Sequence, residues 1–107
     1  MTKTEQKIVD QIKETLKAKY KPVRLFLFGS RANGTAKKDS DYDFVMVVSG
    51  QHRTSSNDTG KAINLIWDTH KISADIFIYS EKEFEDWKDE FSSIPETALN
   101  TGQEIEL

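Results

Sequence analysis

The sequence contains no cysteine, which excludes a disulfide framework and a zinc site built on cysteine ligands. It has only two prolines and no low-complexity segment, so a proline-rich linker is excluded as well. No apolar run approaches the roughly 20 residues that a membrane-spanning helix needs. Residues 1–14 lack the apolar core of a secretory signal and carry acidic residues unlike a transit peptide. We therefore expect no membrane association and a cytoplasmic location.

A block of positive charge is also missing. The formal net charge is −3, and lysines and arginines alternate with acids along the chain. Proteins that hold long nucleic acids usually present a basic face, so stable binding of long nucleic acid by this chain alone is not expected. Free nucleotides remain compatible ligands, because a metal ion and a few backbone donors can neutralise a triphosphate.

The apolar pattern predicts alternating helices and strands. Residues 3–20 carry apolar side chains at steps of four behind a capping box of Thr2 and Glu5, which is typical of an amphipathic helix. Short β-branched and aromatic runs at 23–29, 41–48 and 71–80 predict strands. The stretch 30–40 predicts a turn-rich loop, and 49–60 a polar loop that contains His52 and Arg53.

Three further helices are expected from helical spacing and capping pairs. In the predicted helix 62–70, Trp67 shares a face with apolar residues. A helix capped by Ser80 and Glu83 is expected to turn Phe84, Trp87 and Phe91 inward, and a last short helix follows Ser93 and ends at Gly102.

This order predicts one α/β (α+β) domain over residues 1–107. The length suits a single small core. We expect a two-layer arrangement, with a three- to four-stranded sheet and helices packed on one face. The first two strands are separated by too short a gap for a helical crossover, so the sheet should be mixed rather than purely parallel.

Gly29 and Ser30 stand at the exit of the first predicted strand. Glycine allows close backbone approach to a phosphate, and the following amides with the serine hydroxyl supply neutral donors. Arg31 follows at once and could add a charged fork to a phosphate oxygen. These three residues are candidates for nucleotide binding, although a glycine-serine pair after a strand is more often only a turn.

Asp41 and Asp43 open the second strand, where side chains two residues apart share one face. Two like charges so placed repel each other, and Mg²⁺ would compensate because it prefers carboxylate oxygens. Asp75 lies in the apolar third strand, where an acid is costly to bury unless it is paired or metal-bound. The alternatives are that Asp41 caps a turn, Asp43 faces solvent and Asp75 lies on an edge strand.

If the strands bring these acids together, they form a metal-dependent catalytic site. Two Mg²⁺ ions about 3.5–4 Å apart can activate an attacking oxygen and stabilise a leaving pyrophosphate. Asp41 and Asp43 would bridge both ions, and Asp75 would hold the catalytic ion and orient or deprotonate the acceptor hydroxyl. Gly29 and Ser30 would anchor the triphosphate. The three acids are therefore candidates both as metal ligands and as catalytic residues.

The segment GSRANGTAKKDSDYD resembles the signature of the DNA polymerase β nucleotidyltransferase superfamily, and its context is most similar to the minimal nucleotidyltransferases within it. The resemblance implies a polymerase β-type fold, Mg²⁺ dependence and nucleotidyl transfer, with Asp41, Asp43 and Asp75 matching the three metal-binding acids. Asn33 stands where these proteins often carry a basic residue.

Two functions from different classes follow. The first is an enzyme that moves a nucleoside monophosphate, AMP from ATP, onto a hydroxyl acceptor such as a partner protein. The second is an antitoxin-like binding module that neutralises a HEPN-type partner by complex formation, because the resemblance implies a companion of HEPN-type proteins. A nucleotide binder without turnover is disfavoured, since a retained acidic cluster is a cost to folding. A homodimer is left open.

Overall fold

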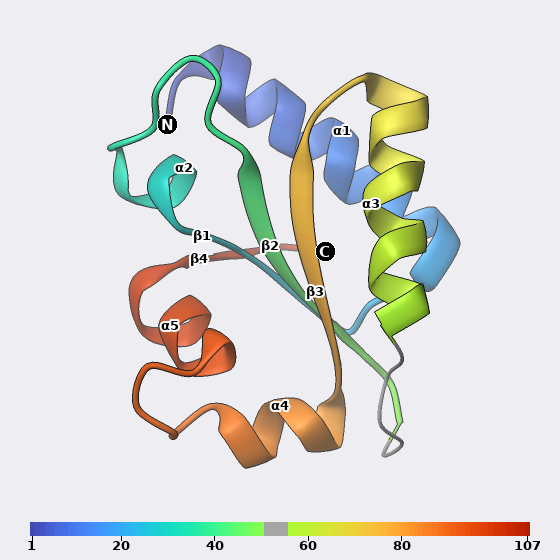
Figure 1. Cartoon of the computed structure of the whole chain (residues 1–107), viewed down its shortest axis with the longest axis vertical. Helices are drawn as coiled ribbons and strands as arrows, with labels where there is room; N and C mark the ends of the chain where they lie inside the picture. The colour runs from blue at the N-terminus through green and yellow to red at the C-terminus, as the bar shows by residue number, and fades with distance from the viewer. Residues whose placement is uncertain (51–55) are drawn as a thin grey trace.

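The computed structural model describes residues 1–50 and 56–107, and Figure 1 shows how its elements follow one another. The helices and strands, in chain order, are α1 (Lys3–Tyr20), β1 (Arg24–Phe28), α2 (Ser30–Asn33), β2 (Tyr42–Val48), α3 (Ser56–His70), β3 (Ala74–Ser80), α4 (Glu81–Trp87), α5 (Ile94–Thr101) and β4 (Gln103–Ile105).

The strands form one mixed sheet in the order β3-β2-β1-β4. Strand β1 runs antiparallel to both β2 and β4, whereas β2 and β3 are parallel. Parallel neighbours need a long crossover, which α3 supplies, while the short stretch between β1 and β2 allows only an antiparallel pair. The predicted α/β class and mixed sheet are confirmed. The short strand β4 is not individually predicted, because three residues leave little periodicity to detect.

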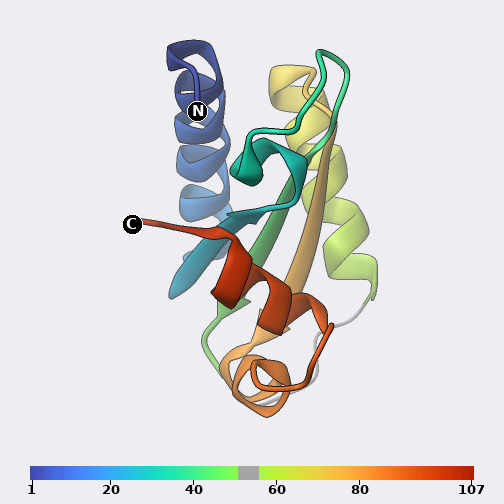
Figure 2. The same ribbon diagram turned by 90° about the vertical axis from the view of Figure 1, so that its left-hand side faces the viewer.

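The sheet carries helices on both faces, which corrects the predicted two-layer arrangement. One core cluster joins α1 and α3 to alternate residues of the sheet, and the other joins α4 and α5 to the intervening residues. Figure 2 shows α5 in front of the sheet and α1 and α3 behind it. Strand β1 explains the difference, since Leu25 and Leu27 face one cluster while Phe26 faces the other. A strand covered on both sides shows no polar alternation that would reveal its second face.

Helix starts follow the predicted capping signals more closely than helix lengths follow the predicted ranges. Thr2 with Glu5, and Ser80 with Glu83, form complete capping boxes. Helix α3 begins at Ser56, so the predicted loop 49–60 is wrong for its last residues. His52 and Arg53 lie outside the described residues. Within the described chain, no helix combines the length and apolar character needed to cross a bilayer.

Three aromatic side chains predicted to face inward are exposed: Trp67, Trp87 and Phe91. Phe84 alone among the predicted inward residues of α4 is fully buried, where its ring stacks on Phe26 with centroids 5.4 Å apart. Helix α4 ends at Trp87, so the helical spacing that would align Phe91 with Phe84 is broken before Phe91. The sequence carries no local signal for this helix end, so the apolar spacing predicts a longer inward-facing stretch than the structure has.

Candidate active site

The exit of β1 and the starts of β2 and β3 lie at one end of the sheet (Figure 1). In the register of the sheet, Asp43 is opposite Phe28 of β1 and opposite Asp75 of β3. Residues paired across a ladder point to the same face of the sheet. The tertiary structure therefore brings together two acids that are far apart in the sequence.

Both acids lie on the sheet face that α4 and α5 cover farther along the strands. Val45 of β2 and Phe77 of β3 follow the acids on this face, and both belong to the core beneath these two helices. Toward the strand starts the cover ends: Asp43 is half-buried, and Asp41 and Asp75 are exposed. The acidic side chains consequently stand at the open margin of an apolar layer, where a ligand can reach them.

The environment of Asp43 opposes its negative charge. Partial burial raises the pKa of the Asp43 carboxyl, and the nearby charges of Asp75 and Asp41, together with a side-chain hydrogen bond with Asp75, raise it further. Both effects act in the same direction because each disfavours the ionised form. A divalent cation at this position would reverse the balance by supplying opposite charge to all three carboxylates.

Gly29 makes room for the Asp43 carboxylate. A Cβ atom on residue 29 would lie 2.5 Å from Oδ2 of Asp43, closer than real Cβ contacts allow. The backbone of Gly29, at φ 75° and ψ −155°, also lies in a region that only glycine adopts without strain. Glycine is thus required here for two independent reasons, and the backbone at the strand exit comes unusually close to an acidic side chain.

Ser30 opens the four-residue helix α2 beside this glycine. The first amides of a helix have no acceptor within the helix, so the amides of Ser30 and Arg31 are suited to bind an anion. The carbonyl of Gly29 accepts hydrogen bonds from the amides of Ala32 and Asn33, and the Ser30 carbonyl accepts one from Thr35. These bonds fold the strand exit into a compact turn around the predicted phosphate anchors.

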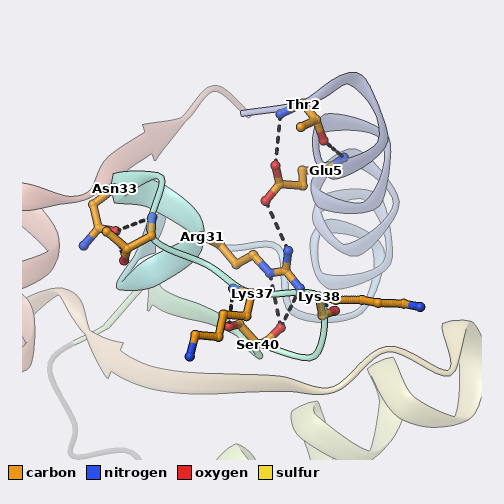
Figure 3. A network of polar contacts seen from close by, with 8 residues as sticks. Thr2, Glu5, Arg31, Asn33, Lys37, Lys38 and Ser40 are labelled. Carbon is orange, nitrogen blue, oxygen red and sulfur yellow. Dashed lines mark hydrogen bonds and ion pairs between the residues drawn. The ribbon is translucent and has the colours of Figure 1, made fainter.

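The guanidinium of Arg31 is directed toward the loop before β2 and toward α1. It donates to the backbone carbonyls of Ser40 and Lys38, and it forms an ion pair with Glu5 (Figure 3). In the same view the side chains of Lys37 and Lys38 extend away from Arg31. The predicted phosphate contact of Arg31 stays a prediction. Each of its three guanidinium nitrogens already donates a hydrogen bond to a protein group.

Asn33 takes a local role. Its side-chain oxygen accepts hydrogen bonds from the amide of Thr35 at 3.1 Å and from the hydroxyl of Thr35 at 2.6 Å (Figure 3). This arrangement stabilises the turn after α2. Asn33 stands where the similar minimal nucleotidyltransferases often carry a basic residue, and its side chain stabilises the loop in this chain.

The residues at this end of the sheet offer the kind of ligand atoms that a hard divalent cation binds. The donor set consists of carboxylate oxygens, which Mg²⁺ prefers, and Asp43 is held against Gly29 with two further acids near it. Among the described residues no set of three acidic or other ligating side chains is already gathered around one point. Asp41 and Asp75 are exposed, and exposed side chains change rotamer readily.

Comparison with known proteins agrees with this arrangement. Residues 9–105 match the family described as the nucleotidyltransferase domain, which covers most of the chain. The chain belongs to this family. No curated protein matches it. A crystal structure of a Sulfolobus solfataricus protein, provisionally described as a nucleotidyltransferase, is similar to it in fold. That match has a TM-score of 0.58 and 23% sequence identity, and it covers 80% of this chain and 76% of the other.

As a nucleotidyltransferase domain, the protein is an enzyme that transfers nucleotidyl groups. The domain carries its candidate acids and its glycine-serine turn at one end of the sheet. Sequence reasoning did not assign a role at the site to Glu5, Ser40 or Tyr42, which surround Arg31. In the sequence, Glu5 has only the pattern of a helix-capping residue. No local pattern links it to Arg31, which lies 26 positions away.

Proposed function

We propose that this chain is a Mg²⁺-dependent nucleotidyltransferase that moves a nucleoside monophosphate, AMP from ATP, onto a hydroxyl acceptor. The observation that carries the proposal is the pairing of Asp43 with Asp75 on one sheet face, against the glycine that closes β1. Residues 1–107 would act as one catalytic domain. The family supports nucleotidyl transfer in general, and the acidic site supports the choice of a divalent metal.

Asp41, Asp43 and Asp75 would hold the metal, and Gly29 with Ser30 would anchor the triphosphate. Magnesium bound to these carboxylates would neutralise the triphosphate and lower the pKa of the attacking hydroxyl. Asp75 would orient that hydroxyl and receive its proton. The acceptor oxygen forms a bond to the α-phosphorus while the bond from that phosphorus to the bridging oxygen breaks, and pyrophosphate leaves with the electron pair.

Asp75 suits the acceptor side of this reaction because it is exposed, whereas Asp43 is half-buried against Gly29. An exposed carboxylate can meet an incoming hydroxyl without displacing protein atoms. A half-buried carboxylate flanked by two others is better suited to hold a cation throughout the reaction. This division of roles follows from position alone and assigns the acceptor to the β3 side of the site.

The identity of the acceptor is part of the proposal. The resemblance to minimal nucleotidyltransferases favours a protein hydroxyl on a HEPN-type partner, and the antitoxin-like binding role remains the alternative. Intact mass spectrometry separates the two functions, because adenylation adds the mass of an adenylate to the partner while sequestration leaves its mass unchanged in a co-purifying complex.

The experiment that tests the proposed function is incubation of the purified protein with labelled ATP, Mg²⁺ and candidate acceptors. We expect transfer of label and release of pyrophosphate, both abolished by chelation and by Asp43→Asn. Asp39→Asn, in the exposed loop before β2, is the matched control and should retain activity. Transfer that survives Asp43→Asn would show that the acidic site is not the catalytic centre.

A further inference from the structure

All three guanidinium nitrogens of Arg31 donate hydrogen bonds to protein groups. Its Nη1 lies 3.2 Å from a carboxylate oxygen of Glu5, and its side chain is only 12% exposed. Its Nε and Nη2 donate to the carbonyl of Ser40 at 3.2 and 2.8 Å. A third carbonyl contact, from Nη2 to Lys38, measures 3.2 Å. A phosphate that took the Nε and Nη2 positions of this fork would have to displace the carbonyls of Ser40 and Lys38.

The groups that Arg31 holds flank Asp41 in the sequence. The carbonyl of Ser40 belongs to the peptide bond that leads into Asp41, and the ring of Tyr42 lies under the guanidinium with its centroid 4.5 Å from Cζ of Arg31. The peptide plane before Asp41 and the residue after it are therefore both fixed by one side chain. No described contact joins Arg31 to Asp41 itself.

The loop before Asp41 is also closed on itself. The amide of Ser40 donates to the carbonyl of Lys37 at 3.0 Å, and the hydroxyl of Ser40 accepts the amide of Lys37 at 2.8 Å. Lys37, Lys38 and Asp39 are exposed in this small turn, so its placement depends on the contacts that hold Ser40. Figure 3 shows that Arg31 connects it to Glu5 at the start of α1.

Glu5 is itself held in place. One carboxylate oxygen accepts the amide of Thr2 at 3.0 Å, while the other accepts from Arg31. These hydrogen bonds lower the pKa of the Glu5 carboxyl, so it stays ionised and remains a fixed counter-charge for Arg31. The capping residues of α1 are thus connected to the backbone beside Asp41: Thr2 bonds to Glu5, Glu5 to Arg31, and Arg31 to the carbonyl of Ser40.

We propose that Arg31 is a positioning residue for the metal site, and that with Glu5 as its anchor it sets the backbone on both sides of Asp41. This inference rests on the proposed function, in which Asp41 is a metal ligand. It gives Arg31 a role that differs from the phosphate contact expected from sequence. Groups that orient metal ligands commonly change metal affinity or activity by about 10–100-fold when they are removed.

Two substitutions test the chain of contacts from its two ends. Glu5→Gln keeps the capping box, since glutamine also fits its third position, but removes the charge that faces Arg31. Arg31→Lys keeps the charge but loses the planar fork. The matched controls are Glu104→Gln and Arg24→Lys, which alter a second arginine–glutamate pair that joins β1 to β4.

The first measurement needs neither nucleotide nor metal. Amide hydrogen exchange should be faster at Lys37 and Ser40 in both Glu5→Gln and Arg31→Lys, and unchanged there in both controls. A thermal melt establishes that each variant is folded. Unchanged exchange in both test variants would overturn the proposal, because the loop would then be held without Arg31.

The second measurement separates positioning from phosphate binding. We expect both test variants to require about 10-fold or more Mg²⁺ for half-maximal binding and activity, with KM for ATP changed less than about twofold. If Arg31→Lys raises KM for ATP while Glu5→Gln changes nothing, Arg31 binds phosphate and the proposal is wrong. Mg²⁺ binding measured by calorimetry is independent of turnover, so absent wild-type transfer would contradict only the proposed function.

Discussion

Asp43 and Asp75 are directly opposite each other in the parallel pair of β2 and β3, and both point to the face that holds α4 and α5. This relationship joins two residues that lie in different strands and on either side of α3. It also explains the raised pKa of Asp43, since partial burial and the neighbouring carboxylates of Asp75 and Asp41 act on it together.

The first prediction concerns the cost of this acidic site to the fold. In the metal-free protein, Asp43→Asn should increase stability at neutral pH by about 0.5 kcal/mol after allowance for solvent screening, which raises the thermal midpoint by roughly 2–4 °C. Because the pKa of Asp43 is higher in the folded state, the folded wild-type protein holds this proton to higher pH than the unfolded chain does. Wild-type stability therefore falls as pH rises through the raised pKa, and the gain from Asp43→Asn should grow over the same range. Calorimetry in the presence of a chelator measures it.

Mg²⁺ should stabilise the wild-type protein and not the Asp43→Asn variant. A ligand that binds only the folded state at 100 times its dissociation constant adds about 2.7 kcal/mol of stability. Thermal melts over a series of Mg²⁺ concentrations would show this as a rising midpoint that a chelator reverses. A variant that responds to Mg²⁺ like the wild type would place the metal elsewhere.

Gly29→Ala should be far more damaging than Gly34→Ala. Both glycines have positive φ, at 75° and 82°, but only at Gly29 would a Cβ meet another atom, Oδ2 of Asp43 at 2.5 Å. The backbone penalty is of order 1–3 kcal/mol at either site, and Gly29→Ala adds displacement of the Asp43 carboxylate. Denaturant unfolding with a transfer assay checks this, and equal loss of activity in both variants would argue against a special role for Gly29.

Phe84→Ala and Phe91→Ala should differ sharply in stability. Phe84 is buried and stacked on Phe26, so truncation should cost about 3–5 kcal/mol. Phe91 is 92% exposed, and its truncation should change the free energy of unfolding by no more than about 0.5 kcal/mol. Urea unfolding compares the two, and a large loss for Phe91→Ala would mean that the residue is covered in solution.

The ion pair of Arg24 with Glu104 should stabilise the attachment of β4 in a pH-dependent way. The hydrogen bond from Arg24 lowers the pKa of Glu104, so the contribution is present above the unfolded-state pKa and is lost as pH falls through the folded-state value. Because Glu104 is half-exposed, Glu104→Gln should cost only about 0.5–1 kcal/mol at pH 7 and nothing in strong acid. Glu106→Gln, outside the ion pairs of the described residues, serves as the control.

Much of the fold could be predicted because its signals are local. The spacing of apolar residues marked α1, and the capping pairs at Thr2 and Ser80 placed two helix starts correctly. The short gap before β2 predicted a mixed sheet, which the structure confirms. The errors arose where local patterns have no boundary: α3 extends into a polar stretch at Ser56, and α4 stops before Phe91.

For the candidate site, the sequence by itself determined which residues are candidates for the chemistry: a glycine-serine pair after a strand, and three acids whose carboxylate oxygens suit Mg²⁺. Only the tertiary structure decided that Asp75 pairs with Asp43, since strand register is fixed by packing on both faces of the sheet. It alone also revealed the contact of Arg31 with Glu5, which arises because the start of α1 lies beside the loop that precedes β2 (Figure 3). Neighbours in space that are distant along the chain leave no local pattern.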